Sequence, residues 1–265
     1  MTEYEQEFSA SELNHFHEHG YVIVEDLYDR SEMQNLKQHA ISLALAPSTP
    51  QGLVKVNAFV KAGVIEGREG IERLHSLFRP QIVSRRFVDV CCDSKLTDRL
   101  AAILGPDVIT FNGLVIFKIK GTGLPFPYHQ DMWYFSRNNE IAISCAIWMA
   151  LDDATIENGC LWIVPGSHKL DIQEHVLPES RHLQQEFREV RAAREMDEIP
   201  VPLRSGSCLF FHGKLLHRSG MNEGTCDRCC YVIHNTTADT VFKMGAGVER
   251  QAIMRTRGGA SLKSN

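Results

Sequence analysis

Val108-Ile-Thr-Phe-Asn-Gly-Leu-Val-Ile-Phe-Lys-Ile119 is the first of five short β-like runs that dominate the chain after Pro106. Gly, Pro and Asn break the chain between these runs. Several short strands separated by turn signals are typical of an antiparallel sandwich or barrel and not of a parallel sheet. The sequence therefore predicts a mostly β structure here, and the remaining runs lie at 141–151, 160–164, 206–212 and 228–236.

The chain before Pro106 has a helical character. Ser9 and Glu12 have the spacing of a capping box, which predicts a helix that ends before Gly20 and is followed by a strand at 21–25. A second helix is expected to begin near Asp29 or Ser31 and to end before Pro47, because its apolar residues recur at helical spacing. Residues 54–64 read as a strand, and residues 70–104 read as helices rich in Leu, Val and Ile.

The domain organisation follows from these patterns. The charged, helix-favouring segment 171–198 interrupts the β runs, and an insertion of this kind between strands is a candidate lid. No Gly/Ser-rich linker and no fixed-period repeat divides the chain. The prediction is one domain over 1–265, with a helical N-terminal part (1–105), a β core (106–240) and a lid-like insertion (171–198).

Composition and charge exclude several classes of protein. The 265 residues are 43% hydrophobic and 23% charged, an ordinary globular balance, and the net charge is −5 without a Lys/Arg run that would bind a phosphate backbone. No stretch approaches the ~18 apolar residues of a bilayer span, and the first residues lack the apolar core of a signal peptide. We expect a cytoplasmic protein with no nucleic-acid or membrane partner, reduced cysteines, and an oligomeric state that the sequence leaves open.

The segment Pro125-Phe-Pro-Tyr-His-Gln-Asp131 contains the first candidate site residues. In an extended chain side chains alternate between faces, so His129 and Asp131 point the same way and offer two adjacent ligands to a metal. An H-x-D pair alone is a weak signal, because the chain has 12 histidines and a hydrogen-bonded surface pair is the plain alternative.

A second motif strengthens the metal hypothesis. His217 follows a β-like run, and in a sandwich a ligand from another strand can complete a face of two histidines and one carboxylate. This set leaves coordination positions open and is favoured by Fe(II) oxygenases, whereas structural zinc prefers a closed tetrahedron. Arg228 opens a later β run with a guanidinium suited to a carboxylate, and Ser219 can donate a further hydrogen bond.

Four stretches together make the sequence resemble the phytanoyl-CoA dioxygenase family of Fe(II)- and 2-oxoglutarate-dependent oxygenases, whose core is a double-stranded β-helix, or jelly roll. They are Gly20-Tyr-Val-Ile-Val24, Pro125 to Asp131, Glu157-Asn-Gly-Cys-Leu-Trp-Ile-Val-Pro-Gly-Ser-His168, and His217-Arg-Ser-Gly220 through Arg228. The resemblance implies iron on His129, Asp131 and His217. It also implies that Arg228 and Ser219 hold the distal carboxylate of 2-oxoglutarate, that Asn112 and Phe126 flank this co-substrate, and that Trp148 lines the pocket.

The activity implied by the resemblance is hydroxylation of a small organic substrate with O2, coupled to decarboxylation of 2-oxoglutarate to succinate and CO2. Related halogenases lack the ligand carboxylate, so Asp131 argues against halogenation. Two alternatives stay open at this point: a cupin-like metal hydrolase, and a catalytically silent binding protein of the same fold. The sequence does not choose among acyl-CoA, a compatible solute, a phosphonate or amino compound, and a secondary metabolite, and it leaves His234 unassigned.

Overall fold

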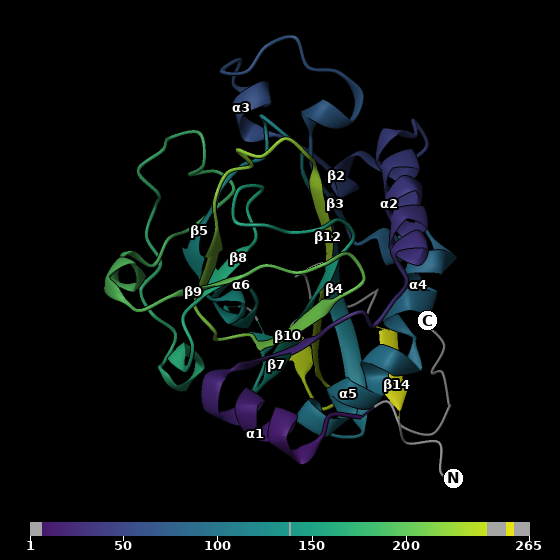
Figure 1. Cartoon of the computed structure of the whole chain (residues 1–265), viewed down its shortest axis with the longest axis vertical. Helices are drawn as coiled ribbons and strands as arrows, with labels where there is room; N and C mark the ends of the chain where they lie inside the picture. Colours follow the sequence, from purple (N-terminus) through teal and green to yellow (C-terminus); the bar gives the residue numbers. More distant parts are fainter. Residues whose placement is uncertain (1–6, 138, 243–252, 257–265) are drawn as a thin grey trace.

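The computed structural model describes residues 7–137, 139–242 and 253–256 (Figure 1). Within this part of the chain, helices lie mainly in the N-terminal third and strands follow. The α-helices are α1 (Ala10–His19), α2 (Arg30–Leu45), α3 (Ala58–Lys61), α4 (Arg85–Cys91), α5 (Ser94–Leu104) and α6 (Asp131–Ser136). None of them combines the length and the apolar character that crossing a bilayer requires.

The strands form two main antiparallel sheets and one short pair. The large sheet has the order β1-β10-β7-β12-β4-β3-β2, with β14 also paired to β4, the small sheet has the order β5-β11-β8-β9, and β13 pairs with β6. The strands are β1 (Tyr21–Val24), β2 (Val54–Val56), β3 (Leu74–Phe78), β4 (Asp107–Lys118), β5 (Phe126–His129), β6 (Asn139–Glu140), β7 (Ser144–Ala150), β8 (Leu161–Ile163), β9 (Ile199–Val201), β10 (Cys208–His212), β11 (His217–Ser219), β12 (Arg228–Thr237), β13 (Val241–Phe242) and β14 (Ile253–Thr256).

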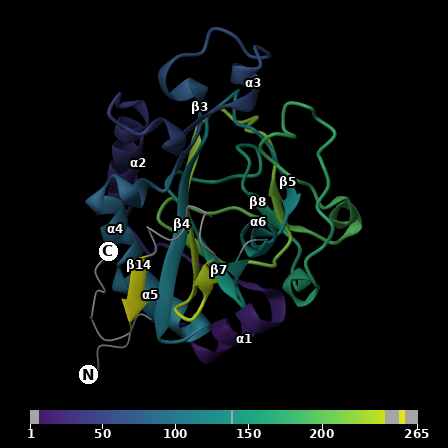
Figure 2. The ribbon, with the colours of Figure 1, turned by 180° about the vertical axis from the view of Figure 1, so that it is seen from behind.

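The helices cover one face of the large sheet and the small sheet lies on the other side. Figures 1 and 2 show α2, α4 and α5 along the outer side of β4 and β12, with β5, β8 and β9 across the molecule. The helix-side core joins Leu36, Phe87 and Leu100 to Tyr231 of the sheet. This arrangement confirms the predicted fold class: a mostly β jelly-roll core flanked by N-terminal helices.

The alternation of side chains along β12 and β4 separates the core from the site. On β12, Cys229, Tyr231 and Ile233 belong to the helix-side core, whereas Cys230 and Val232 pack in the cluster between the two sheets. Because successive side chains point to opposite faces, Arg228 and His234 share the inner face with Cys230 and Val232. Their cross-strand partners on β4 are Lys118 for Arg228 and Asn112 for His234.

The side chains from Arg228 to His234 that share the inner face of β12 form an inner row. A β-bulge in β4 lies beside this inner row. His234 pairs with Asn112, but the next residue, Asn235, pairs with Thr110, so Phe111 is an extra residue on β4. Bulges of this kind locally bend a strand and are common beside functional sites because they redirect side chains. The ring of Phe111 packs edge-on against Phe135 at a centroid distance of 4.9 Å.

Two predictions for the N-terminal part need correction. The expected strand over 54–64 ends at Val56, and α3 begins two residues later because the Asn57 side chain accepts hydrogen bonds from the Phe59 and Val60 N–H groups. The helical reading of 70–104 is wrong for Leu74–Phe78, which forms β3 between β2 and β4. Pairing with an existing sheet edge outweighs the local helical pattern. The capping box of α1 is confirmed, with Ser9 and Glu12 making both of its bonds.

The segment 171–198 has little regular structure. It contains one isolated bridge between Val176 and Glu189 and a short 3-10 helix, Arg191–Glu195, in place of the helices that its composition favours. Leu183 and Phe187 are buried and pack with Leu124, which gives the segment more apolar anchors than its charge suggests. Opening and closing of this segment over a site stays a prediction.

Candidate active site

His129, Asp131 and His217 meet at one end of the small sheet. His129 is the last residue of β5, Asp131 is the first residue of α6, and His217 opens β11 directly opposite His129. One ligand atom from each of the three residues lies within 4.8 Å of the others. The predicted extended course holds through Gln130, whose φ of −118° and ψ of 124° are extended, and α6 begins at Asp131. The structure brings the three predicted ligands together.

Hydrogen bonds to backbone carbonyls orient His129 and His217 so that the Nε2 atom of each ring faces the Asp131 carboxylate. His129 Nδ1 lies 2.8 Å from the Pro127 carbonyl oxygen, and His217 Nδ1 lies 3.0 Å from the Leu215 carbonyl oxygen. A carbonyl only accepts, so each Nδ1 carries the proton and each Nε2 keeps a lone pair. These Nε2 atoms lie 3.5 and 3.7 Å from Asp131 Oδ1. Two nitrogen lone pairs and a carboxylate oxygen fit a divalent transition metal.

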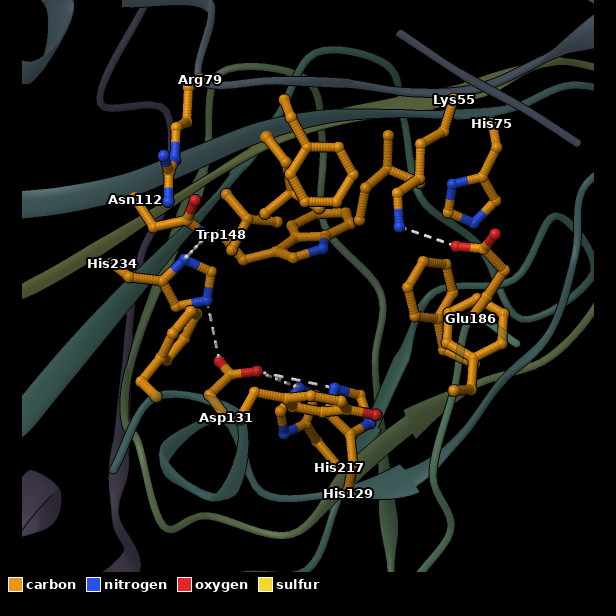
Figure 3. A pocket seen from close by; sticks show the side chains of 18 of the residues that line it. Lys55, His75, Arg79, Asn112, His129, Asp131, Trp148, Glu186, His217 and His234 are labelled. Carbon is orange, nitrogen blue, oxygen red and sulfur yellow. Dashed lines mark hydrogen bonds and ion pairs between the residues drawn. The ribbon is translucent and has the colours of Figure 1, made fainter. Parts of the chain in front are cut away.

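His234 completes the surroundings of Asp131. Its Nε2 lies 3.2 Å from Asp131 Oδ2, and its Nδ1 lies 3.3 Å from the Asn112 amide nitrogen (Figure 3). Sequence reasoning left His234 unassigned, although its strand parity with Arg228 already placed it on the inner face. His234 therefore contacts Asp131 Oδ2, whereas Oδ1 faces His129 and His217, and this contact positions the carboxylate.

Burial and the facing histidines set the protonation of the cluster. Burial alone raises the pKa of Asp131, but His234, His217 and His129 hold that pKa well below its ordinary value. Burial, followed by the neighbouring His129, lowers the pKa of His217 to about 4. At neutral pH the cluster therefore presents a carboxylate and at least one neutral imidazole, which are the forms that bind a metal.

A cavity of about 340 Å³ opens above the cluster (Figure 3). Asn112, Phe126 and Trp148, which the resemblance assigned to the pocket, all line it, and so do Tyr134 and Phe135 after the H-x-D motif. Trp133 instead stacks on His175 at 4.6 Å. The remaining lining residues are Lys55, His75, Phe78, Arg79, Leu114, Ile116, His129, Asp131, Glu186, Phe187, Phe211, His217, Val232 and His234.

Arg228 and Ser219 lie behind the aromatic wall of this cavity and are not among its lining residues. The Arg228 guanidinium is 1% exposed and lies 5.3 Å from the Trp148 ring. Its Nη2 donates to the Gly159 carbonyl at 2.6 Å and its Nη1 contacts Cys230 Sγ at 3.2 Å. Its buried Nε has no hydrogen-bond partner among the described residues. The guanidinium therefore retains an unused donor.

Lys118 is a second buried basic side chain beside Arg228. Its Nζ donates to Ser219 Oγ at 2.9 Å and to the Gly220 carbonyl, and it lies 5.6 Å from the Phe126 ring centre. Burial, followed by the charge of Arg228, lowers the pKa of Lys118 well below its ordinary value. A Cβ at Gly159 would lie 2.9 Å from Lys118 Cδ, so glycine there leaves room for this side chain.

The cysteines and His212 lie outside the ligand cluster. Cys226 is exposed and Cys229 is buried in β12, and all eight cysteines are free thiols. His212 lies 5.3 Å from His168, away from the ligand cluster. Within residues 7–137, 139–242 and 253–256, the only group of three metal-binding side chains is His129, Asp131 and His217.

Known proteins resemble this chain along most of its length. The family model for phytanoyl-CoA dioxygenase (PhyH) matches residues 16–230. Phytanoyl-CoA dioxygenase domain-containing protein 1 from Danio rerio is 30% identical over 131 residues, which are 48% of this chain and 44% of that relative, so the match spans less than half of its length. Methylphosphonate hydroxylase from Gimesia maris is 27% identical over 260 residues, which cover 96% of this chain and 92% of that protein.

Solved structures share the fold. EctD from S. alaskensis, in a crystal structure with 2-oxoglutarate and 5-hydroxyectoine, superposes with a TM-score of 0.74 at 19% sequence identity, covering 92% of this chain and 81% of that chain. The jelly roll, the His-Asp-His cluster and the family match define a 2-oxoglutarate-dependent non-haem iron dioxygenase, a class whose cofactor is Fe(II) and whose co-substrates are 2-oxoglutarate and O2. Within that class, the chain belongs to the phytanoyl-CoA dioxygenase family.

Proposed function

We propose that this enzyme hydroxylates a small organic substrate and converts 2-oxoglutarate to succinate and CO2, with iron held by His129, Asp131 and His217. The observation that carries the proposal is the convergence of two Nε2 lone pairs and one carboxylate oxygen at the base of a cavity. Three protein ligands on one face leave the remaining metal positions to co-substrates, as oxygen chemistry requires.

The co-substrate site that we propose lies at the Arg228 end of the inner row. Arg228 and Lys118 are both 1% exposed, and their contacts on the side of the site are with neutral groups. A buried cation is costly unless it is paired with an anion and hydrogen-bonded. The distal carboxylate of 2-oxoglutarate supplies that anion, accepting hydrogen bonds from Arg228, Ser219 and Lys118. Reaching them requires the Trp148 and Phe126 rings to move aside.

The protein's part in the reaction is binding, orientation and the exclusion of water. When bound, iron supplies oxygen activation coupled to the loss of CO2 from 2-oxoglutarate. Asp131 contributes a negative charge that His234 holds in one orientation. Trp148 and Phe126 contribute apolar rings to the cavity lining, and with 2-oxoglutarate bound these rings help to exclude water from the reacting groups.

The size and lining of the cavity favour a small substrate. The relative from Gimesia maris, named as a methylphosphonate hydroxylase, aligns with nearly the whole chain and supports the same reaction type. Many metal hydrolases use a carboxylate beside the metal as general base. The other carboxylate that lines the cavity, Glu186, is instead bound to Lys55 at 2.7 Å, which favours the oxygenase over the hydrolase.

Succinate formation tests the proposal. Purified protein with Fe(II), ascorbate and 2-oxoglutarate under air is expected to form succinate and to consume O2, and Asp131→Ala is the matched control because it removes one ligand from the same cluster. Anaerobic addition of 2-oxoglutarate to the Fe(II) protein is expected to give a metal-to-ligand charge-transfer band. A wild-type protein with neither band nor succinate is not an oxygenase of this type.

A further inference from the structure

Gln130 stands between the ligands His129 and Asp131, and its side chain is completely buried. Its exposed fraction is 0%, and it is not among the residues that line the cavity. Because side chains alternate along its extended backbone, the Gln130 amide lies behind the two ligands, on the side opposite to the metal site. A buried amide is costly unless it is hydrogen-bonded, so its partners show what this side chain connects.

The Gln130 amide joins the two chain segments that carry the ligands. Its Nε2 donates to the Lys214 carbonyl at 2.8 Å, three residues before His217. Nearby, the Met132 N–H donates to the Gly213 carbonyl at 2.9 Å. The two segments are in close contact here, since a Cβ at Gly213 would lie 2.7 Å from Met132 Cγ. Gln130 therefore helps to hold the two ligand-bearing segments at a fixed separation.

The same amide also binds the beginning of the 171–198 segment. The Gln173 N–H donates to Gln130 Oε1 at 2.7 Å, and Gln130 Nε2 also donates to the Asp171 carbonyl at 3.4 Å. The amide thus uses both of its donors and one acceptor position, in each case on a backbone group of another segment. Because these partners belong to the main chain, they hold the Gln130 side chain in one orientation.

His175 supports the backbone of Gln130. Its Nδ1 lies 2.9 Å from the Gln173 carbonyl oxygen and carries the proton, so its Nε2 accepts the bond that the Gln130 N–H donates at 3.1 Å. The His175 ring also stacks on Trp133, with a centroid distance of 4.6 Å and an interplanar angle of 14°. Trp133 belongs to α6, which begins at Asp131. His175 thereby contacts the chain on both sides of this ligand.

We propose that Gln130 and His175 are positioning residues of the metal site. The Gln130 amide fixes the separation between Asp131 and His217 from behind, and His175 fixes the backbone from which Asp131 projects. This inference rests on the proposed function, because the residues that are positioned are the proposed iron ligands. It also divides the 171–198 segment, whose beginning is part of the rigid frame of the site and does not move with a lid.

Metal binding by glutamine variants tests the role of the amide. Gln130→Met keeps the side-chain length and removes the hydrogen bonds, and Gln130→Glu keeps the shape but places a carboxylate against two carbonyls. Both are expected to bind Mn(II) about 10- to 100-fold more weakly than wild type, because partners that orient metal ligands typically contribute that much. Calorimetry on the metal-free protein measures the affinity, and circular dichroism checks that each variant is folded.

Gln184→Met is the matched control for these variants. The Gln184 amide also donates to a backbone carbonyl, that of Pro178 at 2.8 Å, but it does so within the 171–198 segment. This variant loses a comparable side-chain hydrogen bond without disconnecting the ligand-bearing segments. Its affinity for Mn(II) is expected to stay within about twofold of wild type.

A spectroscopic signature separates positioning from a general loss of stability. The visible absorption of bound Co(II) depends on the arrangement of its ligands, because geometry is diagnostic for such metals. At saturating Co(II), the spectrum of Gln130→Met is expected to differ from the spectra of wild type and Gln184→Met. A residue that only stabilised the fold would lower the free energy of unfolding in urea and leave the spectrum of the folded Co(II) protein unchanged.

Hydrogen exchange tests the role of His175. The N–H groups of Gln130 and Gln173 both donate into this network, so Mn(II) is expected to slow their exchange about 10-fold in wild type. His175→Phe keeps a ring that can stack on Trp133 and removes the acceptor for the Gln130 N–H. The variant is expected to lose the metal-dependent slowing at Gln130 and to bind Mn(II) more weakly than wild type.

Three results would overturn the inference. They are wild-type Mn(II) affinity with an unchanged Co(II) spectrum in the Gln130 variants, wild-type affinity and exchange in His175→Phe, and no effect of Mn(II) on exchange at Gln130 and Gln173 in the wild-type protein. The last measurement needs no variant, so it decides even if a substitution prevents folding. Wild-type protein that binds neither Mn(II) nor Co(II) contradicts the proposed function instead, so the two failures are distinguishable.

Discussion

His234 Nε2 lies 3.2 Å from Asp131 Oδ2, whereas Asp131 Oδ1 faces the Nε2 atoms of His129 and His217. The two oxygens of one buried carboxylate therefore have different surroundings. One is directed at the position between the two ligand histidines, and the other is fixed by a residue from β12. The Asn112 amide in turn contacts the second nitrogen of His234. Two strands of the large sheet thus control the orientation of a ligand that the α6 segment supplies.

Removal of His234 tests this control. His234→Ala is expected to weaken Fe(II) binding about 10- to 100-fold, because partners that orient metal ligands typically contribute that much. Anaerobic titration of the iron-free protein with Fe(II), followed by calorimetry, measures the change. His39→Ala removes a histidine that contacts Ser84 near the outer helices and serves as the control. Equal iron affinity in His234→Ala and wild type would show that Asp131 needs no support from β12.

Substitution of the ligands themselves should abolish iron binding and leave the fold intact. His129→Ala, Asp131→Ala and His217→Ala each remove one of three donors, so neither a charge-transfer band nor succinate is expected. Wild-type protein should gain about 2.7 kcal/mol of stability at a metal concentration 100 times the dissociation constant, and the variants should gain none. Thermal unfolding with and without Mn(II) measures this difference. If a variant keeps the full metal-induced stabilisation, the substituted residue is not a metal ligand.

Substitution of Arg228 or Lys118 should weaken the binding of 2-oxoglutarate and leave the binding of iron unchanged. Removing one partner of a buried charge pair costs roughly 3 to 5 kcal/mol, so Arg228→Ala should lose two to three or more powers of ten in 2-oxoglutarate affinity. Arg228→Lys keeps the charge without the planar fork and should be milder. Titration of 2-oxoglutarate into the anaerobic Fe(II) protein tests both variants. Wild-type affinity for 2-oxoglutarate in Arg228→Ala would show that another basic residue binds the distal carboxylate.

The Lys118→Met variant separates the effect of the buried ammonium on the stability of the fold from its effect on 2-oxoglutarate binding. Without 2-oxoglutarate this variant is expected to be at least as stable as wild type, because a buried ammonium with neutral partners is replaced by an apolar chain of similar length. With 2-oxoglutarate, its affinity should fall by a factor of about 10 or more. Urea unfolding and the charge-transfer titration measure the two effects. Reduced stability together with unchanged affinity would assign Lys118 a purely structural role.

His75 predicts how acid affects stability. Burial lowers the pKa of His75 to about 4, and its ring packs against the Phe126 and Phe187 rings at centroid distances of 5.3 and 5.7 Å. The folded state therefore binds this proton more weakly than the unfolded state, whose pKa is about 6.5. Above pH 6.5 His75 does not affect the free energy of unfolding. As the pH falls from 6.5 to 4, protonation of the unfolded state lowers this free energy progressively, by about 3 kcal/mol at full extent. His75→Phe keeps the ring and should flatten the pH dependence of the unfolding free energy between pH 6.5 and 4. The same slope in both proteins would assign the effect to other groups.

The sequence was most informative where a functional group depends on a short motif. His129 and Asp131 are two residues apart and Arg228 lies eleven residues after His217, so these residues stood out as candidates once the four stretches were taken together. Strand parity with Arg228 placed His234 on the inner face, but its contact with Asp131 and the position of Lys118 beside Arg228 depend on how the strands pair, which no local pattern reveals. The strand at 74–78 was missed for a related reason. Its apolar residues fit a helix equally well, and only the edge of β4 selects the strand.

The extra residue Phe111 in β4 makes the site sensitive to chain length. Deleting Phe111 would change no side chain of the metal cluster or of the co-substrate anchor. Without Phe111, His234–Asn112 and Asn235–Thr110 would become consecutive pairs of a regular ladder, so the register would persist while the local bend of β4 would be lost. The Phe111 ring, whose centroid lies 4.9 Å from that of Phe135 and 6.2 Å from that of His234, would no longer pack against either ring. Two proteins with identical motifs, one with and one without this extra residue in β4, are therefore expected to differ around His234 and Phe135 and to agree at the Arg228 end.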